Sequence, residues 1–223
     1  MIHEKTRHMN IFRNRSTPPS FKTQAGFSLV EILVVISIIA TLAALTVGLA
    51  GRAAEAKKRS QILAEMGVIE MAVERYKEKF GFYPPDNPLD ATRPPLFYEL
   101  TGTRPNGADF QPLVGSESIS GADVLTYFGR PGFANSQPGE AKNFLEQLKS
   151  AQYREIKPNL SGSSVKFLVV PVDGPNPLTG IDDKPMNTWR YNSSSPTNNV
   201  GHFDLWAEVT IRGRTTIIPN WKK

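Results

Sequence analysis

The sequence contains no cysteine, which excludes disulfide bonds, thiolate-bound metal ions and a cysteine nucleophile. It has only three histidines, and two of them, His3 and His8, stand near the N-terminus. The third, His202, alternates with the aromatic residues of a predicted strand, and we expect it to be structural. Motifs of the common serine hydrolases, zinc proteases and nucleotide-binding proteins are also missing. We therefore expect a protein without enzymatic activity.

Positive charge is unevenly distributed along the chain. The 223 residues include 26 Lys and Arg against 21 Asp and Glu, a net charge of +5. Residues 1–25 contain one acid, Glu4, and these basic residues: Lys5, Arg7, Arg13, Arg15 and Lys22. A basic tail beside an apolar segment indicates orientation in a membrane more readily than binding of nucleic acid. No nucleic-acid partner is therefore predicted.

A long apolar run follows this tail. Residues 32–50 contain no charged side chain, and a helix with a rise of ~1.5 Å per residue would extend roughly 29 Å, close to the ~30 Å hydrocarbon core of a bilayer. We predict a membrane span here, with residues 1–26 in the cytoplasm because the basic flank precedes the run. The small residues of "AGRAAEAKK" after the run are also compatible with a cleaved secretory signal, which is the alternative.

Glu31 stands at the head of this run. A carboxylate inside a span costs ~2.5 to 3.5 kcal/mol at the membrane centre and less near an edge. One interpretation places Glu31 among lipid headgroups, at a helix N-terminus whose dipole favours an acid. The segment "GFSLVE", from Gly26 to Glu31, points to a second interpretation, because it lies between a basic leader and a long apolar run. In this it resembles the prepilin signal shared by type IV pilins and the pseudopilins of type II secretion.

The resemblance implies processing at Gly26. In that family a membrane-bound prepilin peptidase cuts after the glycine on the cytoplasmic side and methylates the new amino terminus, here Phe27. The leader would have 26 residues from Met1 or 18 from Met9. Glu31 would contact the terminal ammonium of a neighbouring subunit during assembly, since a paired charge costs less in a membrane than an unpaired one. The implied partners are the prepilin peptidase, other pilin or pseudopilin subunits and an inner-membrane assembly platform.

After the apolar run the pattern becomes one-sided. Apolar residues recur every three or four positions, as on one face of a helix: Ile62, Met66, Ile69, Val73, Tyr76 and Phe80. The simplest prediction is one helix from about Phe27 to about Lys79, with residues 27–51 as the transmembrane or fibre-core part and residues 52–80 as its amphipathic continuation. The alternative, a hinge followed by a separate helix, rests on glycines at positions 48, 51 and 67.

A globular head is predicted over residues 81–223. Gly81 and the Pro84-Pro85 pair end the helix. The last part, about residues 165–219, is rich in β-branched and aromatic residues and is expected to form an antiparallel sheet of three to five strands on the amphipathic helix. The result would be an α+β fold similar to that of type IV pilins.

Two features of the head are more specific. A loop-rich insertion is expected at about residues 86–160, with one short helix near residues 140–153 whose apolar face holds Phe144, Leu145 and Leu148. A hairpin turn is expected at Arg212-Gly213-Arg214.

The C-terminal part also resembles the protein G family of type II secretion pseudopilins. In that family a tryptophan-containing strand precedes an Asp-Leu strand, as Trp189 precedes Asp204 and Leu205 here. The match is partial, because "MNTW" stands where Asp-Pro-Trp-Gly is usual and Ala207 stands where a serine is usual.

Calcium binding is a property of the major members of that family, which hold the ion in an acid-rich loop after the Asp-Leu strand. A hard cation needs several oxygen ligands. Here the segment after Glu208, "VTIRGRTTII", has two arginines and no acid. We expect no cofactor, and Asp204 is the best single candidate for a calcium ligand.

Together these patterns predict a structural subunit of a type II secretion pseudopilus, which drives protein export. The protein would be a single-pass inner-membrane protein with a periplasmic C-terminal domain, assembled in a periplasmic fibre. Two alternatives stay open. One is a type IV pilin or minor pilin, and the other is an uncleaved single-span protein whose external domain binds a ligand.

Overall fold

The computed structural model describes residues 26–157, 163–175 and 178–222. The predicted leader, residues 1–26, lies outside this description except for Gly26. The side chains of residues 46–50 lie outside it as well. The chain divides into two compact units, Met1–Gly48 and Leu49–Lys223.

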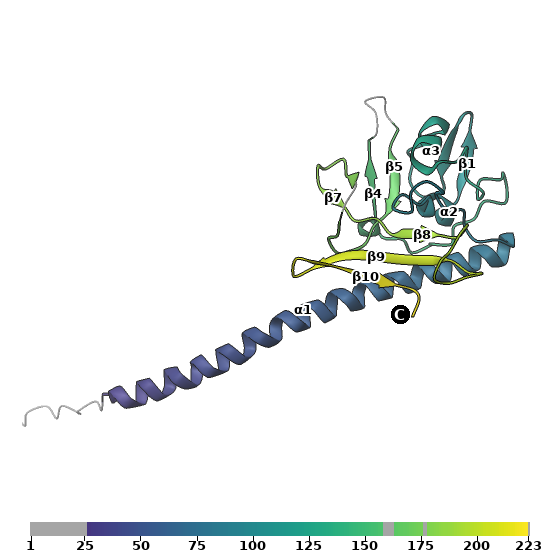
Figure 1. The fold of residues 1–223 in the computed structure, drawn as a ribbon. Coiled ribbons are helices and arrows are strands. Elements are labelled where there is room, and N and C mark those ends of the chain that lie inside the picture. Colours follow the sequence, from purple (N-terminus) through teal and green to yellow (C-terminus); the bar gives the residue numbers. More distant parts are fainter. Residues whose placement is uncertain (1–25, 158–162, 176–177, 223) are drawn as a thin grey trace, which may run out of the picture. The chain divides into compact units, whose positions relative to one another are not determined.

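The first helix, α1, runs over Leu29–Phe80, close to its predicted bounds (Figure 1). In the first unit its described apolar side chains are exposed, and Ile36, for example, is 57% exposed. Among the described residues, no helix combines the length and the apolar character that crossing a membrane requires. This finding differs from our prediction of a membrane span over residues 32–50. Within that range, the side chains of residues 46–50 are not described by the structure.

The part of α1 in the second unit is amphipathic, as predicted. Its buried face consists of side chains that are at most 5% exposed: Ile62, Met66, Ile69, Ala72, Val73 and Tyr76. The helix ends at Gly81, whose N–H donates to the Lys77 carbonyl at 2.7 Å. Gly81 has a φ of 84°, which a residue without a Cβ adopts readily. The predicted end of the helix is therefore confirmed.

Three antiparallel strands lie beside this part of α1: β8 (Arg190–Asn192), β9 (Asp204–Ile211) and β10 (Arg214–Pro219), in the order β10-β9-β8 (Figure 1). The strands β9 and β10 form the predicted hairpin. Its two turn residues, Arg212 and Gly213, have φ values of 51° and 73°, as a two-residue type I′ turn requires. Alternate side chains of β9 are fully buried: Leu205, Ala207 and Val209.

The predicted loop-rich insertion of about residues 86–160 is more regular than expected. Its elements are α2 (Leu96–Thr101), β1 (Thr103–Asn106), β2 (Asp109–Pro112), β3 (Ile119–Ser120), α3 (Gly121–Phe128), the 3₁₀ turn η1 (Ser150–Gln152) and β4 (Tyr153–Ile156). The first three strands form a small antiparallel sheet in the order β1-β2-β3. Elements this short are difficult to predict, because they contain too few residues for the apolar periodicity of a helix or a strand to be recognised.

The prediction of a short helix near residues 140–153 is wrong, since this segment is irregular up to η1 and ends at the first residue of β4. Phe144 and Leu145 are buried, but as separate anchors of an irregular segment. The Phe144 N–H donates to the Leu100 carbonyl at 2.7 Å, and the Leu145 N–H donates to the Asn143 side chain at 2.8 Å. These bonds replace the helical ones that the pattern suggested.

The C-terminal sheet has three strands, the lower limit of the predicted three to five. Two further strand pairs stand apart from β10-β9-β8, namely β4 with β5 (Val165–Leu168) and β6 (Leu178–Thr179) with β7 (Pro185–Met186). Pro171 and Pro175 lack the N–H that a longer ladder after β5 would need. The fold is α+β, with an N-terminal helix and small antiparallel sheets. Its core includes buried aromatic side chains: Tyr76, Tyr98, Phe128, Trp189 and Tyr191.

Candidate functional site

The predicted cleavage site lies just before α1. Gly26 and Phe27 belong to neither a helix nor a strand, and Phe27 is 81% exposed. Exposed backbone outside regular structure is the preferred substrate of proteases, because no helix or sheet has to open first. The peptide bond between Gly26 and Phe27 is therefore accessible to a processing enzyme.

Ser28 and Glu31 form a reciprocal pair at the start of α1. The Glu31 N–H donates to Ser28 Oγ at 3.2 Å, and the Ser28 N–H donates to Glu31 Oε2 at 2.9 Å. This is a capping box, which satisfies two of the backbone donors that the first turn of a helix leaves free. The sequence analysis considered a favourable interaction of Glu31 with the helix dipole, but it did not predict the capping box. The Ser-x-x-Glu signal of such a box is nevertheless present in "SLVE".

The capping box leaves one oxygen of Glu31 available. Within the described ranges Glu31 Oε1 accepts no hydrogen bond, and the residue is exposed. Cleavage between Gly26 and Phe27 would preserve the box, because neither of its two bonds uses an atom of the leader. A processed chain can therefore keep its helix cap and still accept a second donor at Oε1. The contact of Glu31 with a neighbouring subunit stays a prediction.

Asp204, the calcium candidate, organises the loop that precedes β9. It is only 2% exposed. Its Oδ2 accepts hydrogen bonds from the N–H groups of Thr197 and Asn198 at 2.9 and 3.0 Å, and its Oδ1 accepts one from the Asn199 N–H at 2.8 Å. Burial acts to raise the pKa of Asp204, but these bonds outweigh it and hold the pKa below its ordinary value. Both oxygens are already occupied by donors.

The other acidic and histidine side chains that the structure describes do not gather into a metal site. In the part of the chain that the structure describes, no group of three or more His, Asp or Glu side chains is placed to hold a metal ion. His202 contacts the hydroxyl of Tyr83, with 2.9 Å between Nδ1 and the phenol oxygen. This contact joins the loop before β9 to the segment that follows α1.

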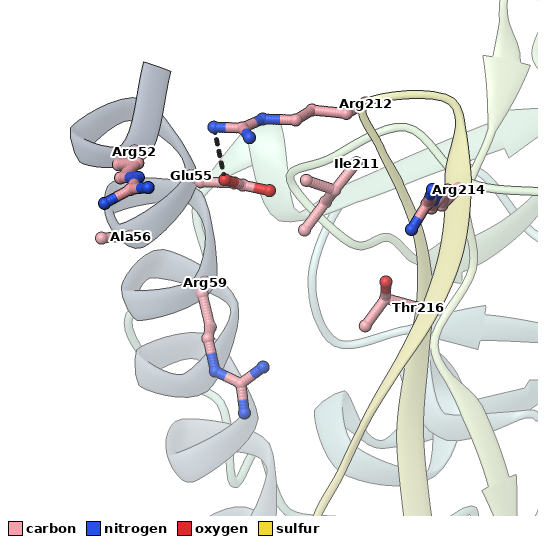
Figure 2. A pocket seen from close by; sticks show the side chains of 8 residues that line it. All are labelled: Arg52, Glu55, Ala56, Arg59, Ile211, Arg212, Arg214 and Thr216. Atoms are coloured by element: carbon pink, nitrogen blue, oxygen red, sulfur yellow. Dashed lines mark ion pairs between the residues drawn. The ribbon is translucent and has the colours of Figure 1, made fainter. Parts of the chain in front are cut away.

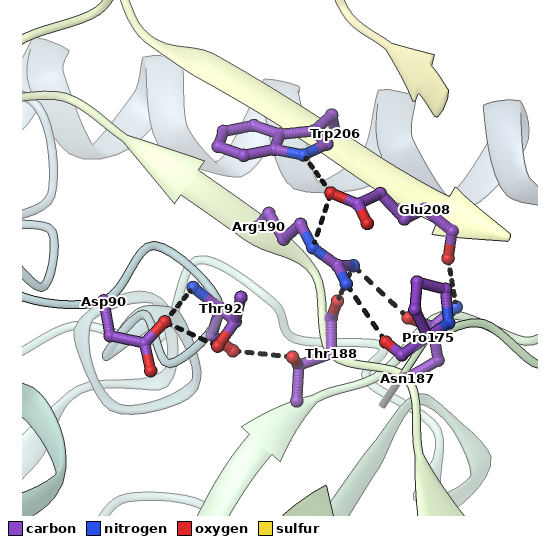
Figure 3. Close-up of polar contacts among 8 residues, drawn as sticks. All are labelled: Asp90, Thr92, Pro175, Asn187, Thr188, Arg190, Trp206 and Glu208. Carbon is purple, nitrogen blue, oxygen red and sulfur yellow. Dashed lines mark hydrogen bonds and ion pairs between the residues drawn. The ribbon is translucent and has the colours of Figure 1, made fainter. Parts of the chain in front are cut away.

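The region with the protein G-like pattern forms a buried polar network around Arg190 (Figure 3). Arg190 is 4% exposed, and its Nε lies 3.2 Å from Glu208 Oε1. The other guanidinium nitrogens donate to the carbonyls of Thr188 and Pro175 at 3.3 and 3.2 Å. The indole of Trp206 donates to the same Glu208 oxygen at 3.4 Å. Burial lowers the pKa of Arg190, and the charge of Glu208 opposes this effect.

A second buried polar centre joins α1 to α2. Glu99 has no exposed surface, and its Oε2 accepts hydrogen bonds from the Tyr76 hydroxyl at 2.9 Å and the Asn135 N–H at 3.0 Å. Its Oε1 accepts a bond from the Ala134 N–H at 2.9 Å. Burial raises the pKa of Glu99, while the hydrogen bonds act in the opposite direction. No sequence signal marks this residue, because its donors come from positions far along the chain.

Comparison with protein families identifies the N-terminal segment. Residues 21–47 match the model of the prokaryotic N-terminal methylation motif, a stretch that includes Gly26, Phe27, Glu31 and most of the apolar run. Comparison with curated proteins found no match, and neither did comparison with solved structures. The motif supports a pilin- or pseudopilin-type protein that is processed by a prepilin peptidase and assembled with other pilin-type subunits.

Proposed function

We propose that the chain is a pseudopilin, a structural subunit of a type II secretion pseudopilus that assembles through its N-terminal helix to drive protein export. The observation that carries this proposal is the methylation motif of residues 21–47, with its cleavage bond exposed and outside α1. Processing would remove residues 1–26 and leave a methylated amino group on Phe27. The role is one of assembly and not of catalysis.

Assembly is proposed to depend on Glu31. Cleavage creates an ammonium at Phe27, and the free Oε1 of Glu31 can accept a charge-assisted hydrogen bond from the ammonium of another subunit. Among apolar helices an unpaired charge is costly and a paired one is less so. Each subunit would therefore be most stable where its Glu31 meets a neighbour's Phe27, which sets the register of the fibre.

The apolar run is proposed to lie in the inner membrane before assembly, with the second unit in the periplasm. The described apolar side chains of α1 in the first unit are exposed, including Leu33, Ile36 and Ile39. An apolar surface of this extent requires a cover. Lipid would provide it in the membrane, and the helices of neighbouring subunits would provide it in the fibre.

The choice of type II secretion over a type IV pilus is supported by the C-terminal pattern. Of the residues that resemble protein G, Trp189 directly precedes β8, and Asp204 and Leu205 begin β9. These two strands are adjacent and antiparallel, and Arg190 pairs with Trp206. A type IV pilin-like fold for the second unit is part of the same proposal.

Reconstitution tests this function. The full chain would be produced with a prepilin peptidase and a type II assembly platform, and isolated fibres would be probed for the chain while export of a reporter cargo is measured. We expect the chain in the fibres and reduced export without it. A matched type IV pilus platform serves as the comparison, and incorporation only there would identify a pilin. A chain that keeps residues 1–26 and enters neither fibre would identify an anchored binding domain.

A further inference from the structure

Four arginines from two distant parts of the second unit line one surface pocket (Figure 2). Arg52 and Arg59 come from α1, whereas Arg212 and Arg214 come from the hairpin of β9 and β10. One acid, Glu55, lies among them and forms an ion pair with Arg212 at 2.9 Å. Four positive charges against one negative charge leave the pocket with a formal charge of +3.

Three of these arginines lack a counter-ion of their own. Over the described residues, Arg52, Arg59 and Arg214 take part in no ion pair, and all three are exposed. Bringing like charges together costs Coulomb energy, which an anion bound among them would offset. A guanidinium presents five N–H donors in a planar fork that matches the oxygens of a phosphate. The chemistry of the pocket therefore favours a phosphate-bearing ligand.

The hairpin turn contributes to the geometry of this pocket. Arg212 has a φ of 51°, a conformation that a residue with a Cβ rarely adopts and that Asn or Gly usually occupies in such turns. Its side chain reaches across to Glu55 on α1, as Figure 2 shows. This ion pair holds the hairpin against the helix, and it brings Arg214 to the same pocket as Arg59.

The place of the pocket along the chain indicates the source of the phosphate. Arg52 follows the last residue of the apolar run by two positions, and Arg59 follows it by nine. On the translocated side of a membrane, a flank this close to a span is usually poor in Lys and Arg. Basic residues at this position are therefore unusual, and the headgroup region of a bilayer, which carries the lipid phosphates, adjoins the end of a span.

We propose that this arginine pocket binds the phosphate of an anionic phospholipid headgroup at the periplasmic face of the membrane. The inference rests on the proposed function, since it requires the apolar run to lie in the bilayer. It adds a ligand, an anionic lipid, and a binding site in the second unit. The methylation motif, over residues 21–47, implies neither.

Native mass spectrometry of the full chain, taken from its own membranes into a non-ionic detergent, tests the proposal. The probes are phosphatidylglycerol, the zwitterionic phosphatidylcholine and inorganic phosphate. The test variant combines Arg52→Gln, Arg59→Gln and Arg214→Gln, and it keeps the ion pair between Arg212 and Glu55. The control variant combines Lys57→Gln, Lys58→Gln and Lys184→Gln, which removes the same charge outside the pocket.

We expect wild type to bind phosphatidylglycerol in preference to phosphatidylcholine. The arginine variant should lose about tenfold or more in affinity, because a hydrogen bond to a charged group contributes at least that much. The lysine variant should stay close to wild type. If the triple arginine variant fails to fold, as shown by its thermal unfolding, the single variant Arg214→Gln replaces it.

Three outcomes would overturn the proposal. Equal losses in both triple variants would show an effect of net charge alone, and equal binding of the two lipids would show no selectivity for an anion. Inorganic phosphate that binds as tightly as the lipid would assign the pocket to free phosphate.

The same spectra report the N-terminus of the chain. If the chain begins at Phe27 and does not bind phosphatidylglycerol, only the lipid site is refuted. If the chain retains residues 1–26 and binds phosphatidylglycerol, only the processing is refuted.

Discussion

The hydroxyl of Tyr76, on α1, donates a 2.9 Å hydrogen bond to Oε2 of Glu99, a carboxylate in α2 with no exposed surface. Two backbone N–H groups, from Ala134 and Asn135, complete the donors around this carboxylate. A buried acid depends on such donors, because burial removes the water that would otherwise solvate it. The helix that carries the methylation motif is thus tied to the rest of the second unit through a polar contact as well as through its apolar face.

Replacing Tyr76 with phenylalanine should destabilise the second unit by about 1.5–3 kcal/mol, the usual contribution of a hydrogen bond to a charged group. Urea unfolding of the full chain in detergent measures this change. The matched control is Tyr83→Phe, whose hydroxyl bonds to Glu74 and His202 near the surface. That change should cost less than about 1 kcal/mol. Equal losses in the two variants would contradict the importance assigned to the buried contact.

Asp204→Asn should destabilise the protein in a pH-dependent way. Hydrogen bonds hold the pKa of Asp204 below its ordinary value, so the carboxylate stabilises the fold above the unfolded-state pKa of about 3.9. This contribution is lost as the pH falls through the lower pKa of the folded state. We expect a loss of about 1–3 kcal/mol at neutral pH that shrinks in acid. A pH series of unfolding curves measures it, and a penalty that grows in acid would refute the role given to this carboxylate.

Calcium should leave the thermal stability of the protein unchanged. Both oxygens of Asp204 already accept backbone N–H bonds, and a cation would have to displace them. Thermal unfolding with added calcium and with a chelator should therefore give the same midpoint. A midpoint several degrees higher in calcium, and lost in Asp204→Asn, would place the ion at this loop after all.

Two substitutions separate the roles of Glu31 in capping and in assembly. Glu31→Gln keeps a side chain that can complete a capping box but removes the charge, so we expect a stable helix and loss of the chain from fibres. Ser28→Ala removes the cap and keeps the charge, so incorporation should persist. Glu31→Leu should behave as Glu31→Gln does, with the protein stable in the membrane. Quantification of the chain in isolated fibres distinguishes these cases, and normal incorporation of Glu31→Gln would exclude the charge pairing.

Features that depend on neighbouring residues in the chain could be predicted from the sequence. The buried stripe of α1, the helix end at Gly81 and the Arg212-Gly213 turn each follow from a local pattern. The motif from Gly26 to Glu31 is also local, because its residues are consecutive and its flanks adjoin it in the chain. The capping box is just as local and could have been read from the same residues.

Features that depend on contacts between distant segments could not be predicted. The donors to Glu99 come from α1 and from the segment after α3, and the arginine pocket combines α1 with the last hairpin. The helix expected at residues 140–153 failed for the same reason. The Phe144 N–H bonds to Leu100, and nothing in the local pattern indicates that distant acceptor.

The most direct test is the intact mass and N-terminal residue of the chain purified from its own membranes. Processing at the exposed bond between Gly26 and Phe27 predicts a mature chain that begins with N-methylated Phe27 and lacks residues 1–26. A chain that begins at Met1 or Met9, with an unmodified Phe27, would contradict the account and leave the methylation motif without a role.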